Sequence, residues 1–167
     1  MSLAALLGAA VWSDIRTGRI PNRLLVAGLL AGALLSCLPH GLDWVDASLG
    51  LLTGLAVYLP FYLLRVLGAG DVKLLATVGV FVGWPEILIV AFFSALAGGV
   101  LALALAAYTG RMRETVAQVH QTVLYQFTHM HSSHRLQPVE VAAHSVQMPY
   151  ALAIAIGTLA HAAWARA

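Results

Sequence analysis

Long apolar runs follow one another along this chain, separated only by short polar stretches, and they restrict the folds open to it. The run over residues 47–67 is long enough to cross a bilayer, because a helix of about 20 apolar residues spans the hydrocarbon core. A soluble domain carries roughly 25% charged residues, whereas this chain has 10%, and 60% of its residues are hydrophobic. The sequence therefore predicts an all-α membrane protein.

Proline- and glycine-containing breaks divide the apolar sequence into six segments. Each break removes helical hydrogen bonding or favours a turn, as in Pro39–Gly41 and at Pro85. We expect transmembrane helices over residues 2–13, 24–38, 47–67, 72–83, 87–108 and 146–164. Pro21 and Asn22 are expected to open the second helix, since proline suits the first helical turn. Residues 1–167 are thus expected to form one membrane-embedded domain, a bundle of six transmembrane helices.

The first segment is short for a span. The 13 residues before Asp14 cover about 20 Å as a helix, and the hydrocarbon core is about 30 Å thick. Either the bilayer thins locally or a few residues precede the given start, and the sequence leaves both readings open. A cleaved signal peptide is not expected here, because no basic residue precedes the apolar run and no small-residue cleavage site follows it.

Residues 109–147 are polar by comparison and carry a periodic apolar pattern. Apolar side chains recur there at spacings of three and four, which places them on one face of a helix. They are Val116, Val119, Val123, Phe127 and Met130. We expect this cytoplasmic segment to contain an amphipathic helix lying on the membrane surface.

The basic residues orient the expected bundle. Eight of the nine Lys and Arg residues fall in three alternate polar stretches, 14–23, 65–73 and 109–147. The positive-inside rule assigns these stretches to the cytoplasm and both termini to the other side. The arginines are expected to contact anionic lipid. With a net charge of only +2, the chain gives no indication of nucleic-acid binding.

Two aspartates, Asp14 and Asp71, fall at the cytoplasmic boundary of this topology. Ionisable groups at membrane depth are costly and point to function. Two neighbouring carboxylates can share a proton, so that one activates water as a base while the other acts as an acid. Structural roles remain as alternatives. Asp71 could cap the fourth helix, and Asp14 could be an exposed loop charge paired with Arg16 or Arg19.

No metal or organic cofactor is expected. The single cysteine, Cys37, excludes an internal disulfide and a Cys-x-x-Cys site. Three histidines cluster at 129, 131 and 134, but a spacing of two does not place both partners on one helix face. A polar interfacial segment explains them without a metal ion.

Three stretches resemble signatures of the type IV prepilin peptidase family. Residues 68–74 (GAGDVKL) are similar to its G-x-G-D-x-K-L motif, whose core is shared with other intramembrane-type aspartyl peptidases. Residues 14–22 (DIRTGRIPN) resemble its Asp–Arg stretch ending in Ile-Pro-Asn, and residues 149–155 (PYALAIA) resemble the opening of its last helix. The resemblance implies that Asp14 and Asp71 are the catalytic aspartates.

The same motifs imply residues that support the site or contact substrate. These are Gly68, Gly70, Lys73, Pro21, Asn22 and Pro149. Glycines permit the close approach of another chain, although Gly68 and Gly70 would equally make a simple turn. Lys73 could hold a substrate carboxylate or extend to the lipid headgroups, and the residues alone do not separate these roles.

The implied activity is that of a membrane aspartyl endopeptidase. It would remove the leader from a prepilin or pseudopilin at the cytoplasmic face of the bacterial inner membrane. The chain has no counterpart of the N-terminal methyltransferase region and four-cysteine zinc site of the larger members, so we expect peptidase activity without N-methylation. This compact form resembles the branch that serves tight-adherence (Flp) pili.

Two other functions are compatible with a polytopic membrane protein. A small proton-coupled transporter would place its acidic residues near the middle of the membrane, whereas both aspartates here fall at a boundary. A non-enzymatic scaffold subunit of a pilus or secretion machine would tolerate Asp→Asn at both positions.

Overall fold

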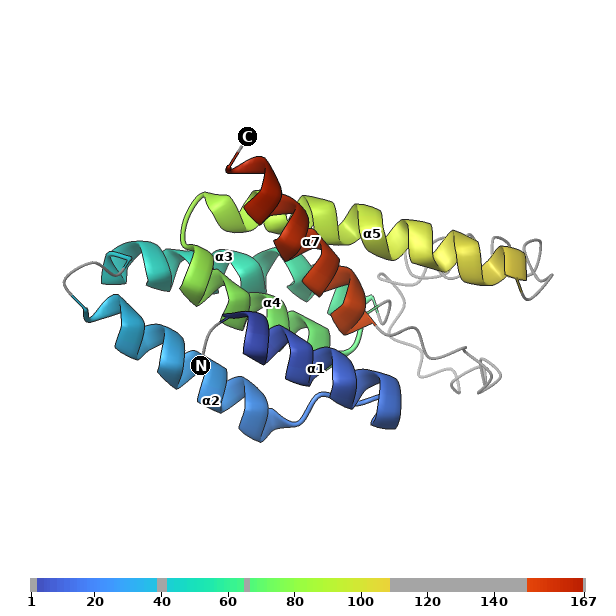
Figure 1. Ribbon diagram of the computed structural model, residues 1–167, viewed down its shortest axis with the longest axis horizontal. Helices are drawn as coiled ribbons and strands as arrows, with labels where there is room; N and C mark the ends of the chain where they lie inside the picture. Colours follow the sequence, from blue (N-terminus) through green and yellow to red (C-terminus); the bar gives the residue numbers. More distant parts are fainter. Residues whose placement is uncertain (1–2, 39–41, 65–66, 109–149, 167) are drawn as a thin grey trace, which may run out of the picture.

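The computed structural model describes residues 3–38, 42–64, 67–108 and 150–166, and over these residues it contains six α-helices and no strand (Figure 1). The all-α fold class is thereby confirmed. The helices are α1 (Leu3–Thr17), α2 (Asn22–Ser36), α3 (Trp44–Leu63), α4 (Ala69–Val82), α5 (Glu86–Tyr108) and α7 (Tyr150–Trp164). The expected amphipathic helix within 109–147 lies outside the described residues.

The first helix is longer than expected, and this changes the setting of Asp14. We expected the helix to end at Ser13, but α1 continues to Thr17 and contains Asp14. Its last turn closes at Gly18, which has a φ of 61° and donates its N–H to the Asp14 carbonyl at 2.8 Å. The drop in hydropathy therefore marked a change in polarity along one helix rather than the end of that helix.

The other helix boundaries follow local capping signals. Helix α2 begins at Asn22 directly after the extended residue Pro21, as predicted. Helix α3 begins at Trp44, three residues earlier than expected, because Asp43 caps it by accepting the Val45 N–H at 3.5 Å. Helix α4 likewise begins at Ala69 rather than at residue 72, because Gly68 is already extended and serves as its N-cap.

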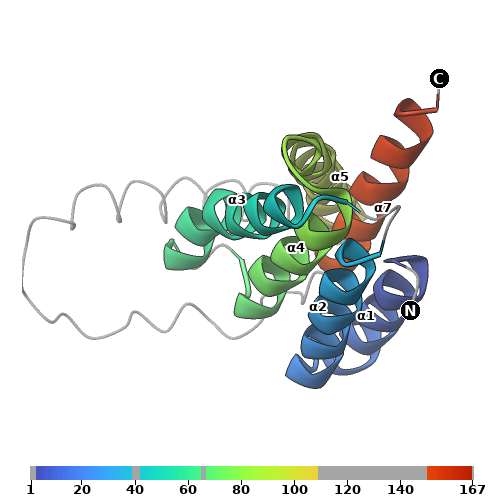
Figure 2. The same ribbon diagram turned by 90° about the vertical axis from the view of Figure 1, so that its left-hand side faces the viewer.

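Helix α4 lies in the middle of the bundle (Figures 1 and 2). Eight of its 14 residues are buried, and α3 packs along it while α5 pairs with α7. The α3–α4 contact is a backbone contact: a Cβ added at either Gly50 or Gly79 would meet the other's carbonyl oxygen. Small residues of this kind allow close helix packing in membranes.

Two helices are long and apolar enough to cross a bilayer, namely α3 and residues Glu86–Leu105 of α5. The outward faces of the bundle are also apolar, with exposed side chains such as Leu30, Phe92 and Leu159. Helices α1, α2, α4 and α7 have only 14 or 15 residues each. Within the described residues, the fold is therefore an all-helical bundle with two clear candidate spans.

Candidate active site

The first candidate residue, Asp14, is held by the last helix of the chain. Its Oδ2 accepts the backbone N–H of Ala151 at 3.1 Å, across 137 residues of sequence. Ala151 is buried in the first turn of α7, where N–H groups have no partner within their own helix. The positive end of the α7 dipole thus faces the half-buried Asp14 carboxylate.

The second candidate, Asp71, lies in the first turn of α4, and its setting is also a helix N-terminus. Its Oδ2 accepts the backbone N–H of Gly68 at 3.2 Å. This is the contact of an acidic residue at the third helical position with the N-cap amide. The structural alternative is therefore partly correct, because Asp71 does help to cap α4. One such bond uses a fraction of the acceptor capacity of a carboxylate.

The two carboxylates are electrostatic neighbours. Asp14 and Asp71 come from different helices, both are half-buried, and the charge of Asp14 acts on Asp71. The alternative for Asp14, an exposed loop charge paired with an arginine, is wrong. Among the described residues neither Arg16 nor Arg19 pairs with it, and the Arg16 guanidinium instead stacks 4.3 Å from the centre of the Trp12 ring.

The two aspartate-containing stretches also contact each other directly. Lys73 Nζ donates to Asn22 Oδ1 at 3.2 Å, and a Cβ added at Gly70 would contact Ile20 at 3.4 Å. The structure therefore brings residues 14–22 and 68–74 into one site, and it gives Lys73 and Asn22 a shared role in joining α2 to α4. Pro21 supports this arrangement as the N-cap of α2.

Gly68 packs more closely against the Asp71 carboxylate than a role as a simple turn residue requires. A Cβ added there would lie 3.1 Å from Asp71 Oδ2, tighter than ordinary packing. The absence of a side chain at this position therefore allows the carboxylate to fold back onto the Gly68 amide. Pro149 and the clustered histidines fall outside the described residues.

Two tyrosines that were not expected as site residues, Tyr58 and Tyr150, lie near the candidate aspartates. Tyr58 of α3 is only 2% exposed, and its ring packs edge-on against Tyr150 with centroids 6.2 Å apart. Tyr150 directly precedes Ala151, whose N–H is donated to Asp14. Tyr150 belongs to residues 149–155, the stretch that resembles the opening of the family's last helix. For Tyr58 the available signal was a hydroxyl-bearing residue in the middle of an apolar span, but sequence alone does not tell whether such a residue faces lipid or protein.

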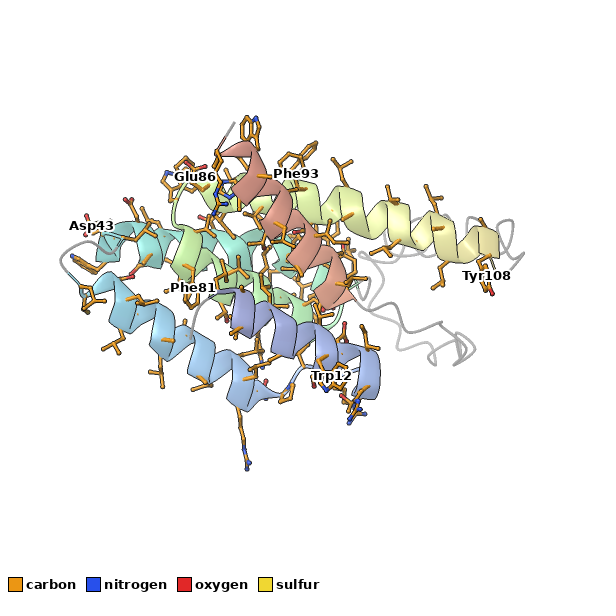
Figure 3. All side chains as sticks on the ribbon, viewed as in Figure 1. Trp12, Asp43, Phe81, Glu86, Phe93 and Tyr108 are labelled. Atoms are coloured by element: carbon orange, nitrogen blue, oxygen red, sulfur yellow. The ribbon has the colours of Figure 1, made fainter. Side chains whose placement is uncertain are left out.

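The carboxylates at the other end of the bundle are separate from this site. Figure 3 shows Asp43 and Glu86 near one end, and Trp12, two residues before Asp14, towards the other. Glu86 Oε2 lies 3.4 Å from His161 Nε2, so the end of α7 is tied to the start of α5 there. Asp43 is thus available as a control carboxylate remote from the candidate pair.

Comparison with known proteins places the chain in a family. Residues 1–103 match the type IV leader peptidase family. A prepilin leader peptidase/N-methyltransferase of Myxococcus xanthus (strain DK1622) is 32% identical over 120 residues, covering 65% of this chain and 35% of that protein. A protein of the same name from Burkholderia pseudomallei (strain 1026b) is 32% identical over 118 residues, covering 66% of this chain and 38% of that protein.

The chain also matches a prepilin leader peptidase/N-methyltransferase of Aeromonas salmonicida (strain A449), with 32% identity over 110 residues, 62% of this chain and 38% of that protein. The matches cover little more than a third of the length of these curated relatives. No solved structure matches the chain. The family match covers more than half of the chain and both aspartate-containing stretches, and the chain therefore belongs to the type IV leader peptidase family.

Proposed function

We propose that this chain is a membrane aspartyl endopeptidase that cleaves the N-terminal leader from a prepilin or pseudopilin. The observation that carries the proposal is the contact between residues 14–22 and residues 68–74, which draws together the stretches of Asp14 and Asp71 although the two aspartates lie 57 residues apart in sequence. Each carboxylate is anchored by a backbone amide at a helix N-terminus. Family membership and the names of the relatives support leader cleavage as the reaction.

The proposed chemistry needs only these two carboxylates and water. One carboxylate removes a proton from water, whose oxygen attacks the carbonyl carbon of the scissile bond. The other, protonated, carboxyl group donates its proton to the amide nitrogen as the C–N bond breaks. The backbone amides of Gly68 and Ala151 restrain one oxygen of each carboxylate. The remaining oxygens are then available to water and substrate.

Gly68, Gly70, Lys73, Asn22, Pro21 and Pro149 are proposed as the supporting residues of this site. For Lys73 and Asn22, the support is the contact that joins α4 to the start of α2. For Gly68, it is the space left for the Asp71 carboxylate. These positions act by fixing the aspartates relative to each other, and catalysis depends on such fixed geometry.

We further propose a single domain with six transmembrane helices in the bacterial inner membrane, with the aspartates at the cytoplasmic face. The concentration of eight of nine basic residues in alternate polar stretches supports this orientation. Helices of 14 or 15 residues are about 21–23 Å long at 1.5 Å per residue. Local thinning of the bilayer around them would accommodate this length.

The proposal is tested by co-expression with pilin precursors in a host that lacks its own leader peptidase. Precursors of Flp-type pilins are the first choice, and leader loss is read from the intact mass of the pilin. The parent chain and an Asp43→Asn control should both cleave, whereas Asp71→Asn should not. If Asp71→Asn cleaves as the parent does, the aspartate pair is not the catalytic unit and the assignment fails.

A proton-coupled transporter fits the geometry less well. Such a carrier needs carboxylates along its path through the middle of the membrane, whereas Asp14 lies in the last turn of α1 and Asp71 in the first turn of α4. The scaffold alternative is decided by the same Asp71→Asn experiment.

A further inference from the structure

Tyr58 combines deep burial with a hydroxyl that has no hydrogen bond. It is 2% exposed, although α3 exposes much of its remaining surface. Within the described part of the chain, the Tyr58 hydroxyl and the Ser94 hydroxyl are both buried without a hydrogen-bond partner. An unpartnered buried hydroxyl costs stability, and phenylalanine would fill nearly the same space without that cost. Stability alone therefore gives no reason for a hydroxyl at this position.

The polar neighbours of this hydroxyl come from two other helices. They are the side chains of Ser94 in α5 and Tyr150 in α7. Ser94 packs closely on α7, because a Cβ added at Gly157 would run into its hydroxyl and its backbone. The Tyr58 ring also packs edge-on against the Tyr150 ring. Three hydroxyls from three helices thus lie close together in the interior of the bundle.

This cluster connects the two halves of the candidate active site. Tyr150 is the first residue of α7, and the next residue, Ala151, donates its N–H to Asp14. Tyr58 lies on α3, the helix that packs most extensively on α4, which carries Asp71. The Tyr58–Tyr150 contact therefore lies between the helix end that holds Asp14 and the helix that carries Asp71.

We propose that Tyr58 is a positioning residue for the aspartate pair and that it acts through Tyr150. Its hydroxyl, held against those of Tyr150 and Ser94, fixes the first turn of α7 and with it the amide that anchors Asp14. The dipole of the Tyr58 hydroxyl favours one orientation of the neighbouring hydroxyls, whereas dispersion contacts between the rings do not select one. This inference rests on the proposed peptidase function.

The test is Tyr58→Phe in the purified, detergent-solubilised enzyme, with cleavage kinetics on a pilin precursor and thermal unfolding measured in parallel. We expect kcat to fall about tenfold or more, KM to stay within about twofold, and the unfolding midpoint to stay the same or rise. Tyr62→Phe is the matched control, because Tyr62 is exposed on the same helix and should change neither quantity. A Tyr58→Phe enzyme with parental kcat would overturn the inference, and so would one whose lower activity is matched by a lower unfolding midpoint.

A double-variant cycle tests the route through Tyr150. Tyr150→Phe should lower kcat in the same direction, and the double variant Tyr58→Phe/Tyr150→Phe should be little worse than either single one, because residues acting as a unit are not additive. Fully additive losses would overturn the route. Cleavage by the parent enzyme distinguishes failure of the proposed function from failure of this inference. A parent that does not cleave removes the proposed function and this inference together, whereas a cleaving parent with a silent Tyr58→Phe removes only the inference.

Discussion

Replacement of Asp14 or Asp71 by asparagine should remove catalytic activity while leaving the fold nearly as stable as that of the parent. Asparagine keeps an oxygen that can accept the anchoring N–H groups, from Ala151 at position 14 and from Gly68 at position 71. Each substitution converts a charge-assisted hydrogen bond, worth about 1.5–3 kcal/mol, into a neutral one, worth about 0.5–1.5 kcal/mol. Relief of the repulsion between the two carboxylates offsets part of this loss. Stability should therefore change by no more than about 1 kcal/mol.

Activity should respond very differently from stability. Loss of a general acid or base typically costs 10²–10⁴-fold in rate, so we expect each of Asp14→Asn and Asp71→Asn to lose about a thousandfold in kcat/KM. That corresponds to about 4 kcal/mol of transition-state stabilisation at 1.36 kcal/mol per tenfold. Independent residues would give about a millionfold loss in the double variant, whereas a catalytic unit gives a loss close to that of one substitution.

The assay is leader cleavage from a purified precursor in detergent, followed by mass spectrometry over several days so that slow variants are measured. Circular dichroism and thermal unfolding of the same preparations report on the fold. Asp43→Asn is the control, because asparagine caps helix α3 as well as aspartate does and Asp43 lies at the other end of the bundle (Figure 3). If either site variant retains more than a tenth of the activity, or if the losses in the double variant are additive, Asp14 and Asp71 do not act as one catalytic unit.

Three further predictions follow from the packing and the charge pattern. Gly68→Ala places a Cβ 3.1 Å from Asp71 Oδ2, so kcat should fall severalfold with an unfolding midpoint near the parental value; an enzyme at full rate would show that the carboxylate moves freely. Gly79→Ala forces a Cβ against the Gly50 carbonyl and should destabilise the protein by about 1–3 kcal/mol, whereas Gly99→Ala, which meets no atom within 4 Å, should be neutral in the same unfolding measurement. Cysteines introduced at Arg19 and Arg111 in the Cys37→Ser background should not react with a membrane-impermeant thiol reagent in intact cells. Labelling of either cysteine from outside would contradict the proposed orientation.

The fold class and the candidate pair were predictable from the amino-acid sequence. Apolar runs of near-spanning length predict helices without any knowledge of packing, because an isolated chain in a bilayer must satisfy its backbone hydrogen bonds locally. Proline and glycine gave the start of α2 at Asn22 and the break before α4, since they act through backbone geometry that is local to the chain. The stretches carrying Asp14 and Asp71 were recognisable for the same reason, as short contiguous patterns.

The surroundings of these residues depend on the tertiary structure. The anchoring of Asp14 by Ala151, the contact of Lys73 with Asn22 and the burial of Tyr58 all join residues far apart in sequence. The hydropathy pattern that reveals the core of a soluble protein gives little help here. In a membrane bundle the lipid-facing and core-facing sides of a helix are both apolar. Which side of α3 faces α4 and α7, and hence that Tyr58 points inward, is therefore set by close packing between helices.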